Sequence, residues 1–523
     1  MDNKIMGNMG DLLVLTLLSG LCFYEAHTSL VEIDISSYDP EKVETLSYHE
    51  FIENLNENTT EIVVKSNNTN QQGFFIIQAH SSHYNVCLST YDNKSHTYIG
   101  HNIGMVQFFI SAFTYSFNLE NSSSQNTTVL ITVTVYNNSA PIPGGCSESL
   151  NNTNISPIVK LIDGLEVITM NVEAPSLKGF TCNDIKNETL VQVYHKFLPG
   201  QNFGTFSYYS GILAMLTVQD IQKNGRLVSS TRGHSNLEKI FSSYLGVGEI
   251  FAVVVTINEK SSAYIPSISF GEDINILIEN HDKGNSGLFF ILFSILPVVG
   301  IIIIYRGHTF FHFTTFLFGT SCGIIISLFM LNHDESSIGN STLIESILLG
   351  LLYGLVWLGA WYKWGLPLLS TSITFLHCGV FLSCVIYYVG VADREMFHSN
   401  GAYWSIFCGI VIASWFILSV LTTFGHIFAC ALLGSYILTL TTLNKLMNGN
   451  MQYIFINVCR RMYVPNFNEA ILDPPYQPQD VISSFIAICF TLHGMWRQLK
   501  NQVGKPPFPA HMSRHRGERT PLL

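Results

Sequence analysis

The second half of the chain, from residue 287 to residue 497, is a series of long apolar stretches separated by short polar segments. A helix needs about 20 apolar residues to cross a bilayer, and most of these stretches approach that length. We identify seven of them, at 287–305, 309–331, 343–362, 366–390, 402–421, 425–443 and 480–497. The sequence therefore predicts a multi-pass α-helical membrane protein whose residues 287–497 form a seven-helix bundle in the lipid bilayer.

Residues 30–280 are polar instead, and rich in Asn, Ser and Thr. Runs of β-branched and aromatic residues bounded by Asn and Ser indicate strands at 73–80, 106–117, 129–136, 190–198 and 250–257. The phrase SAPIP at 139–143 recurs as SAYIP at 262–266, each time after such a strand. One β-sandwich takes roughly 100 residues. We therefore expect a mainly β region of two sandwich-like units, residues 27–147 and 148–278, followed by a linker, residues 279–286.

The N-terminus predicts entry into the secretory pathway. The apolar run at 12–23 is short for a membrane span, which favours a signal peptide over residues 1–26; an uncleaved first helix is the alternative. Sequons for N-glycosylation follow. They begin at Asn58, Asn67, Asn93, Asn121, Asn126, Asn137, Asn151, Asn154 and Asn187, with one more between two spans at Asn340. The sequence thus predicts a glycoprotein with an extracellular or lumenal N-terminal region.

Seven spans would bring the tail, residues 498–523, into the cytosol. The basic residues of this tail agree with that orientation, because cytosolic segments carry an excess of Lys and Arg. Arg460 and Arg461 do not agree, because the loop after the sixth span would lie outside the cytosol. Residues 451–464 are therefore either an amphipathic helix on the membrane surface or part of a span that we have miscounted.

The polar half has three cysteines after the predicted signal peptide: Cys87, Cys146 and Cys182. A lumenal or extracellular setting permits disulfides, and three cysteines leave one over. We expect a bond between Cys146 and Cys182; a bond from Cys87 to either one is the alternative. The cysteines in the apolar half are expected to be small packing residues.

The sequence GTSCG at 319–323 matches the Gly-x-Ser-x-Gly pattern of serine hydrolases, with His377 or His426 as conceivable bases. That pattern works on a strand-to-helix turn, whereas Ser321 lies within a predicted span. We interpret Gly319, Ser321 and Gly323 as small residues that let helices approach closely, as do Gly350 and Gly354 in the next span. We predict no catalytic, cofactor-binding or metal-binding residues and hence no enzyme.

The last residues, GERTPLL, place Glu518 four positions before Leu522 and Leu523. This pattern resembles an acidic dileucine sorting signal, in which a carboxylate and two leucines bind a clathrin adaptor. We therefore expect the protein at the plasma membrane, in endolysosomal membranes, or both.

Four stretches together resemble the transmembrane 7 superfamily member 3 family: PIPGGC at 141–146, VYHKFLPG at 193–200, SAYIP at 262–266 and ERTPLL at 518–523. The resemblance implies a multi-pass protein linked to cell survival, to protein homeostasis under stress (the unfolded-protein stress response) and, in vertebrate members, to insulin secretion. It supplies no catalytic residues.

The net charge of −11 argues against nucleic acid as a partner, because phosphates bind basic surfaces. The favoured function is a non-enzymatic, receptor-like or scaffold-like membrane protein whose N-terminal region binds a protein partner. A transporter or channel with a lumenal cap is the alternative, and an intramembrane serine hydrolase is a distant third.

Overall fold

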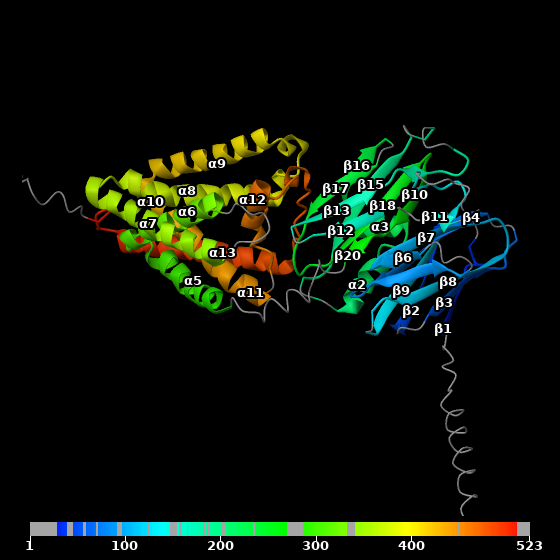
Figure 1. The fold of residues 1–523 in the computed structure, drawn as a ribbon. Coiled ribbons are helices and arrows are strands. Elements are labelled where there is room, and N and C mark those ends of the chain that lie inside the picture. Colours follow the sequence, from blue (N-terminus) through cyan, green and yellow to red (C-terminus); the bar gives the residue numbers. More distant parts are fainter. Residues whose placement is uncertain are drawn as a thin grey trace, which may run out of the picture.

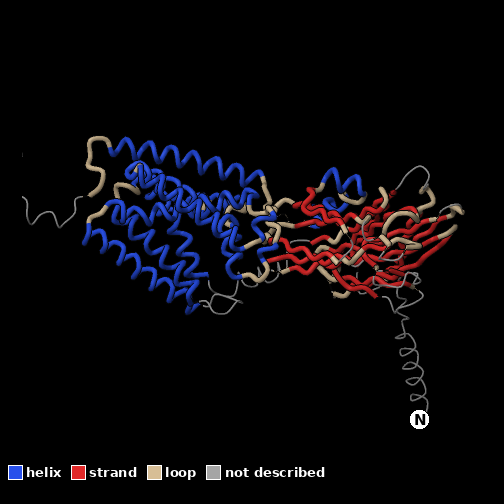
Figure 2. Tube along the Cα trace, turned by 90° about the horizontal axis from the view of Figure 1, so that it is seen from above, coloured by secondary structure: helices blue, strands red, loops and turns tan. Residues whose placement is uncertain are grey.

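The computed structural model describes residues 29–38, 45–55, 59–69, 72–91, 97–123, 125–146, 154–155, 159–164, 166–180, 184–185, 188–200, 202, 204–233, 236–268, 286–331, 340–447 and 449–509. Strands and helices are segregated into two halves that lie end to end (Figures 1 and 2). We call residues 29–268 the head and residues 286–509 the bundle. This arrangement confirms the predicted fold class, a mainly β N-terminal region followed by a helical membrane bundle.

The first sandwich of the head consists of two five-stranded sheets. One has the order β1 (Ser29–Asp34), β3 (Thr60–Ser66), β8 (Phe113–Asn121), β5 (Val86–Thr90) and β6 (Thr97–Gly100). The other has the order β11 (Asn154–Ile155), β7 (Asn102–Phe109), β4 (Gly73–Ser81), β9 (Thr127–Asn137) and β2 (Thr45–Leu55). Burial alternates along β3, which covers only one core.

The second sandwich of the head is smaller. One sheet has the order β12 (Val159–Asp163), β13 (Val167–Val172) and β17 (Leu237–Ser242). The other has the order β16 (Arg226–Arg232), β15 (Leu190–Phe197), β18 (Glu249–Ile257) and β19 (Lys260–Tyr264), and β20 (Ser267–Ile268) also pairs with β18. Two short helices, α2 (Thr205–Leu213) and α3 (Val218–Asn224), connect β15 to β16.

The two sandwiches share a buried core. Every residue of β4 is buried, because Phe75 and Ile77 point into the first sandwich while Phe74 and Ile76 pack against the second. The chain also crosses between the sandwiches: β10 (Ile142–Gly145) pairs with β14 (Pro175–Ser176), and β11 joins the sheet of β7. Apolar packing and strand pairing between the two sandwiches therefore both stabilise the head.

The recurring phrases lie side by side where the sandwiches meet. Tyr136, just before SAPIP, accepts a hydrogen bond from the Ala263 amide (3.2 Å) and contacts the Ala263 carbonyl with the same hydroxyl (3.3 Å). Ala263 of SAYIP lies in β19, which forms a tight hairpin with β18, whereas SAPIP follows β9 and its Ile142 begins β10, which pairs with β14. The two phrases thus differ in local structure.

The bundle contains seven long helices in the described residues. They are α5 (Ser286–Arg306), α6 (Phe311–Leu331), α7 (Asn340–Trp364), α8 (Pro367–Ile386), α9 (Asn400–Val420), α10 (Thr422–Thr441) and α13 (Pro478–Gln502). Five of them, α6 to α10, are long and apolar enough to cross a membrane. The central helix is α10, which packs against α5, α8, α9 and α13.

The segment between α10 and α13 forms the end of the bundle that faces the head. It contains α11 (Leu443–Met447), α12 (Tyr453–Tyr463) and the 3₁₀ turn η3 (Phe467–Glu469). Two further turns on this side, η1 (Tyr387–Val391) and η2 (Glu395–His398), connect α8 to α9. Residues 451–464, whose placement the sequence left open, thus form a short helix outside the long ones, between the bundle and the head (Figure 1).

Candidate functional site: the contact between the head and the bundle

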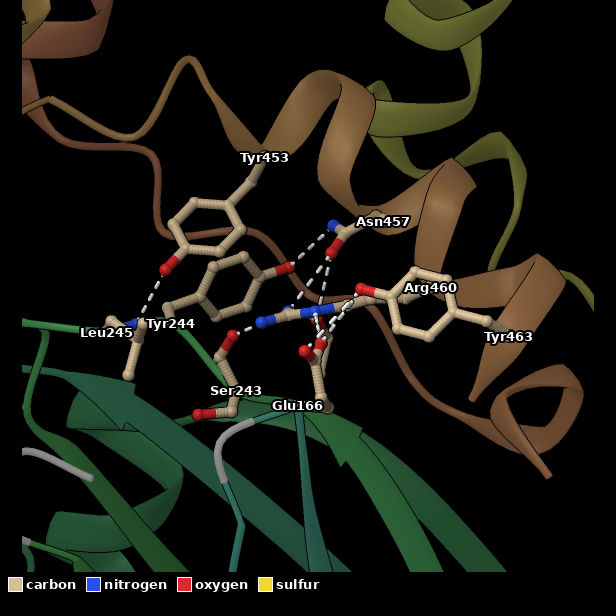
Figure 3. A network of polar contacts seen from close by, with 9 residues as sticks. Glu166, Ser243, Tyr244, Leu245, Tyr453, Asn457, Arg460 and Tyr463 are labelled. Atoms are coloured by element: carbon tan, nitrogen blue, oxygen red, sulfur yellow. Dashed lines mark hydrogen bonds and ion pairs between the residues drawn. The ribbon is translucent and has the colours of Figure 1, made fainter. Parts of the chain in front are cut away.

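One face of α12 points at the head. Tyr453, Asn457 and Arg460 are spaced four and three residues apart, so they lie on the same face of the helix. All three are buried. Their partners are residues of the second sandwich, so the polar face of α12 is covered by protein (Figure 3).

Arg460 is the centre of this contact. Its Nε donates to Glu166 Oε2 at 2.6 Å, and its Nη1 donates to the Ser243 carbonyl at 2.7 Å and to Ser242 Oγ at 3.0 Å. The Arg460 side chain is 3% exposed and that of Glu166 is 42% exposed. Arg460 did not agree with the orientation expected from the positions of basic residues. Its positive charge is paired, and its guanidinium is held by three groups of the head.

Two tyrosines pack beside this pair. The Leu245 amide donates to the Tyr453 hydroxyl at 2.7 Å, and the Tyr244 and Tyr453 rings meet edge to face at 4.8 Å. Asn457 Nδ2 donates to the Tyr244 hydroxyl at 3.3 Å, while Asn457 Oδ1 accepts from Ser242 Oγ at 3.0 Å. Burial raises the pKa of Tyr244 well above its ordinary value, so the phenol stays neutral. The network satisfies most of the polar atoms that docking buries.

The bundle also extends a sheet of the head. The Ile471 amide donates to the Ile240 carbonyl at 2.8 Å, and the Ser242 amide donates to the Ile471 carbonyl at 3.0 Å. Residue Ile471 thereby forms a parallel bridge with Phe241 at the open edge of β17. Apolar packing of Ile240 against Phe467 and Leu472 surrounds these bonds. This is strand addition within one chain, in which main-chain bonds fix the register.

A buried charged cluster lies next to this bridge. His195 Nδ1 on β15 is 2.8 Å from Asp473 Oδ2, and His195 Nε2 is 3.2 Å from Glu249 Oε2 on β18. Arg226 on β16 contacts the other oxygen of Asp473. The side chains of His195, Glu249 and Asp473 are only 3%, 2% and 5% exposed. Asp473 belongs to the segment between α12 and α13, so the bundle supplies one charge of this cluster and the head supplies the others.

The protonation of His195 follows from its two carboxylate neighbours. Burial by itself lowers the pKa of His195, but the hydrogen bond to Asp473 and the adjacent Glu249 outweigh it and raise the pKa to about 9. Burial also raises the pKa of Glu249. A cavity of about 270 Å³ opens beside the cluster, between β15, β16 and the segment that carries Asp473 and Tyr476.

The sequence-predicted small residues meet across α6 and α7. A Cβ on Gly319 would lie 3.0 Å from Gly354 Cα, and one on Gly323 would lie 2.9 Å from Gly350 Cα. The four glycines therefore lie where the two helix backbones approach most closely. Ser321 is half-buried within α6, and in the described residues no hydrogen bond links it to a histidine.

The predicted glycosylation sites differ in accessibility. Asn67 and Asn126 are exposed, and Asn137 is half-buried. Asn121 is 9% exposed, and its Nδ2 donates to the Leu55 carbonyl at 2.9 Å and to the Gln125 carbonyl at 2.7 Å. A glycan on that nitrogen would disrupt both bonds. Asn58, Asn93, Asn151 and Asn187 lie outside the described residues, as do the side chains of Asn154 and Asn340.

Other predictions fall only partly within the described residues. Cys146 is disulfide-bonded and follows Gly144 and Gly145, whose φ angles of 76° and 85° favour glycine. Cys182, its expected partner, lies outside the described residues, and Cys87 is half-buried in β5. The signal peptide over 1–26, residues 279–285 of the linker predicted at 279–286, and the sorting residues Glu518, Leu522 and Leu523 also lie outside them, whereas Ser286 begins α5.

Comparison with known proteins decides the family. Three TM7SF3-like family models match consecutive parts of the chain: the N-terminal immunoglobulin-like domain at 44–136, the second immunoglobulin-like domain at 141–275 and the TM7S3/TM198-like domain at 293–499. The chain belongs to the transmembrane 7 superfamily member 3 family. In this family's terms, the two sandwiches of the head are immunoglobulin-like domains and the bundle is the TM7S3/TM198-like domain.

The relatives cover most of the chain at low identity. Human transmembrane 7 superfamily member 3 is 24% identical over 463 residues, which cover 84% of this chain and 79% of the human protein. The mouse protein of the same name is 25% identical over 399 residues, covering 72% and 68%. Among solved structures, the glycoside hydrolase domain of Endo-D from Streptococcus pneumoniae R6 is 11% identical, and the match covers 43% of this chain and 33% of that one. Its TM-score of 0.13 does not indicate a shared fold.

Proposed function

We propose that this family member is a non-enzymatic, receptor-like or scaffold-like membrane glycoprotein whose immunoglobulin-like head binds a protein partner. The observation that carries the proposal is the contact of Arg460 with Glu166 and Ser243, which makes the head and the bundle one unit. A partner bound to the head would act on α12 directly, and α12 packs on α8. Neither the family models nor the named relatives describe an enzyme.

The packing of the bundle favours this function over a transporter. Aromatic rings fill the space between α8, α10 and α12, where Phe381 lies 4.7 Å from Tyr436, and Tyr436 lies 5.6 Å from Phe455. Tyr387 of η1 packs edge to face on Tyr403 of α9 at 4.7 Å. A dense core of this kind suits helices that shift as a unit, whereas a transporter needs a polar path at the centre of the bundle.

We propose further that the head faces the extracellular or lumenal side and the tail faces the cytosol. The far end of the bundle supports this orientation, because Arg306, Lys363 and Lys500 lie at the last turns of α5, α7 and α13. A specific protease site inserted next to Asn340 should be cut only from the side of the head. Cleavage from the cytosol would contradict this orientation.

The tail supports a proposal about location. An acidic dileucine signal at Glu518, Leu522 and Leu523 would bind a clathrin adaptor and deliver the protein to endolysosomal membranes. Replacing both leucines by alanine should then shift the protein to the cell surface. An unchanged distribution would show that this segment is not a sorting signal.

The resemblance to the family supports a role in cell survival and in protein homeostasis under stress, with insulin secretion as a role that it implies for vertebrate members. The test is rescue of cells that lack the protein. The wild type should restore survival under a protein-folding stress, and Lys223→Met, on an exposed position of α3, should rescue equally. Arg460→Met, expressed at the same level, should fail if docking transmits the signal, and full rescue by Arg460→Met would contradict the proposed coupling.

A further inference from the structure

The buried cluster of His195, Glu249 and Asp473 couples two parts of the chain through a titratable group. His195 and Glu249 belong to the head, whereas Asp473 reaches the cluster only when the bundle segment is docked. The His195 ring is also fixed by aromatic neighbours, because it stacks on Phe251 at 4.4 Å and meets Phe197 at 4.2 Å. The ring position is therefore fixed, with Nδ1 hydrogen-bonded to Asp473 and Nε2 lying 3.2 Å from Glu249 Oε2 without a hydrogen bond of its own among the described residues.

We propose that His195 is a proton-dependent latch: docking of the Asp473 segment on the head takes up a proton, so that acidification tightens the head on the bundle and alkaline conditions release it. The proposal extends the proposed function, since it describes how the docked unit would respond to an acidified compartment. It rests on the geometry of the cluster and on the docking contact described above.

The direction of the pH effect on docking follows from which half of the molecule supplies each charge. The pKa of His195 is about 9 when Asp473 is in place, against an ordinary value of 6.5. Removing Asp473 removes the hydrogen bond that raises this pKa, so the undocked head holds the proton less tightly. The docked state thus binds more protons in a pH window whose upper limit is about 9. Over that window docking weakens by up to about tenfold per pH unit as the pH rises.

Two further carboxyl groups near the cluster act in the same direction as His195. Glu249 on β18 and Asp393, which accepts a hydrogen bond from the Leu472 amide, both have a pKa raised mainly by burial. Both therefore favour the docked state as the pH falls, with the same sign as His195. Arg226 on β16 contacts Asp473 and offsets one carboxylate of the cluster.

The titration of Lys196, the next residue on β15, has the opposite effect on docking. Burial lowers its pKa, so docking favours its neutral form. Its side chain lines the cavity beside the cluster and forms no ion pair within the described residues. The variant Lys196→Met therefore serves as the control, and it should leave the pH dependence of docking in place.

Hydrogen exchange of the full chain in lipid nanodiscs tests the latch. The Ile471 and Ser242 amides donate across the contact, so their protection reports docking directly. After correction for the intrinsic exchange rate, their protection should fall as the pH rises from 6.5 to 9 in the wild type and in Lys196→Met. This fall between pH 6.5 and 9 should be lost in His195→Gln and in Asp473→Asn.

The two proposals fail in different ways. Protection that is high but independent of pH in the wild type would overturn the latch and leave the docked head intact. A pH dependence that persists in both His195→Gln and Asp473→Asn would overturn it as well. Absence of protection at every pH would instead contradict the docking on which the proposed function rests. Asp473→Asn lies outside the two sandwiches, so it keeps the test informative if His195→Gln does not fold.

Discussion

Arg460 on α12 and Glu166 on the head are 294 positions apart in the chain and form an ion pair with Nε 2.6 Å from Oε2. The pair is asymmetric, because the arginine is buried and the carboxylate is half-exposed to water. The head therefore neutralises a cation that the bundle could not leave in an apolar environment. This relationship joins the two halves of the molecule.

Replacing Arg460 by methionine should weaken docking by about 2 kcal/mol. The substitution keeps much of the apolar length of the side chain but leaves the Ser243 carbonyl without its donor. Combining Arg460→Met with Glu166→Gln should give a coupling energy of about 1 kcal/mol or less, because Glu166 is partly solvated. The measurement is the protection of the Ile471 amide in a double-mutant cycle, with Lys223→Met as the control. Purely additive effects would show that the two side chains do not interact.

The contact between α6 and α7 predicts different effects for two glycines of one helix. A Cβ on Gly350 would lie 2.8 Å from the Thr320 carbonyl oxygen, whereas one on Gly359 would meet nothing within 4 Å. Gly350→Ala should cost about 1–3 kcal/mol through overpacking, and Gly359→Ala should be neutral or slightly stabilising. Thermal unfolding of both variants in one detergent makes the comparison. Equal melting temperatures would contradict the close approach of the helices.

The buried position of Asn121 predicts that it carries no glycan in the folded protein, although it begins a sequon. Its two hydrogen bonds link β8 to Leu55 at the end of β2 and to Gln125 in the turn before β9. Asn121→Gln should destabilise the head by about 1–2 kcal/mol, and Asn126→Gln, at an exposed site, should not. Glycopeptide mass spectrometry should find Asn121 unmodified. A folded protein with a glycan on Asn121 would contradict this geometry.

The disulfide of Cys146 predicts a bond to Cys182. Closing a loop of about 35 residues should stabilise the head by about 4 kcal/mol on the chain-entropy model. Non-reducing peptide mapping should recover one peptide pair that contains both cysteines, and Cys146→Ser should lower the melting temperature of the head. Recovery of Cys87 in the pair with Cys146 would show that the pairing is wrong.

Much of the fold could be predicted from local patterns. A bilayer imposes both length and apolarity, so the predicted spans 287–305 and 402–421 differ by two residues or fewer from α5 and α9. The single run predicted at 106–117 is in fact β7 and β8, which are joined by a turn at 110–112. That turn contains Ile110, which is apolar yet 66% exposed, and it contains no Gly, Pro or Asn. Apolarity alone could not reveal it.

The contact between the head and the bundle was not predictable in the same way. The spacing of Asn457 and Arg460 indicates an amphipathic helix, but the pattern is the same whether its polar face meets water, lipid head groups or protein. The only local signal was that Arg460 and Arg461 lie on the side of the membrane where basic residues are rare. Glu166 and His195 are hundreds of residues away from α12 and resemble ordinary surface residues of strands and turns.

Cryo-electron microscopy of the full chain in lipid nanodiscs tests the docked head most directly. If the head and the bundle are one unit, classification should give a single head orientation, with density joining Arg460 to Glu166 and the strand of Ile471 beside β17. A continuous range of head orientations about the end of the bundle, with no density between α12 and the head, would contradict the account.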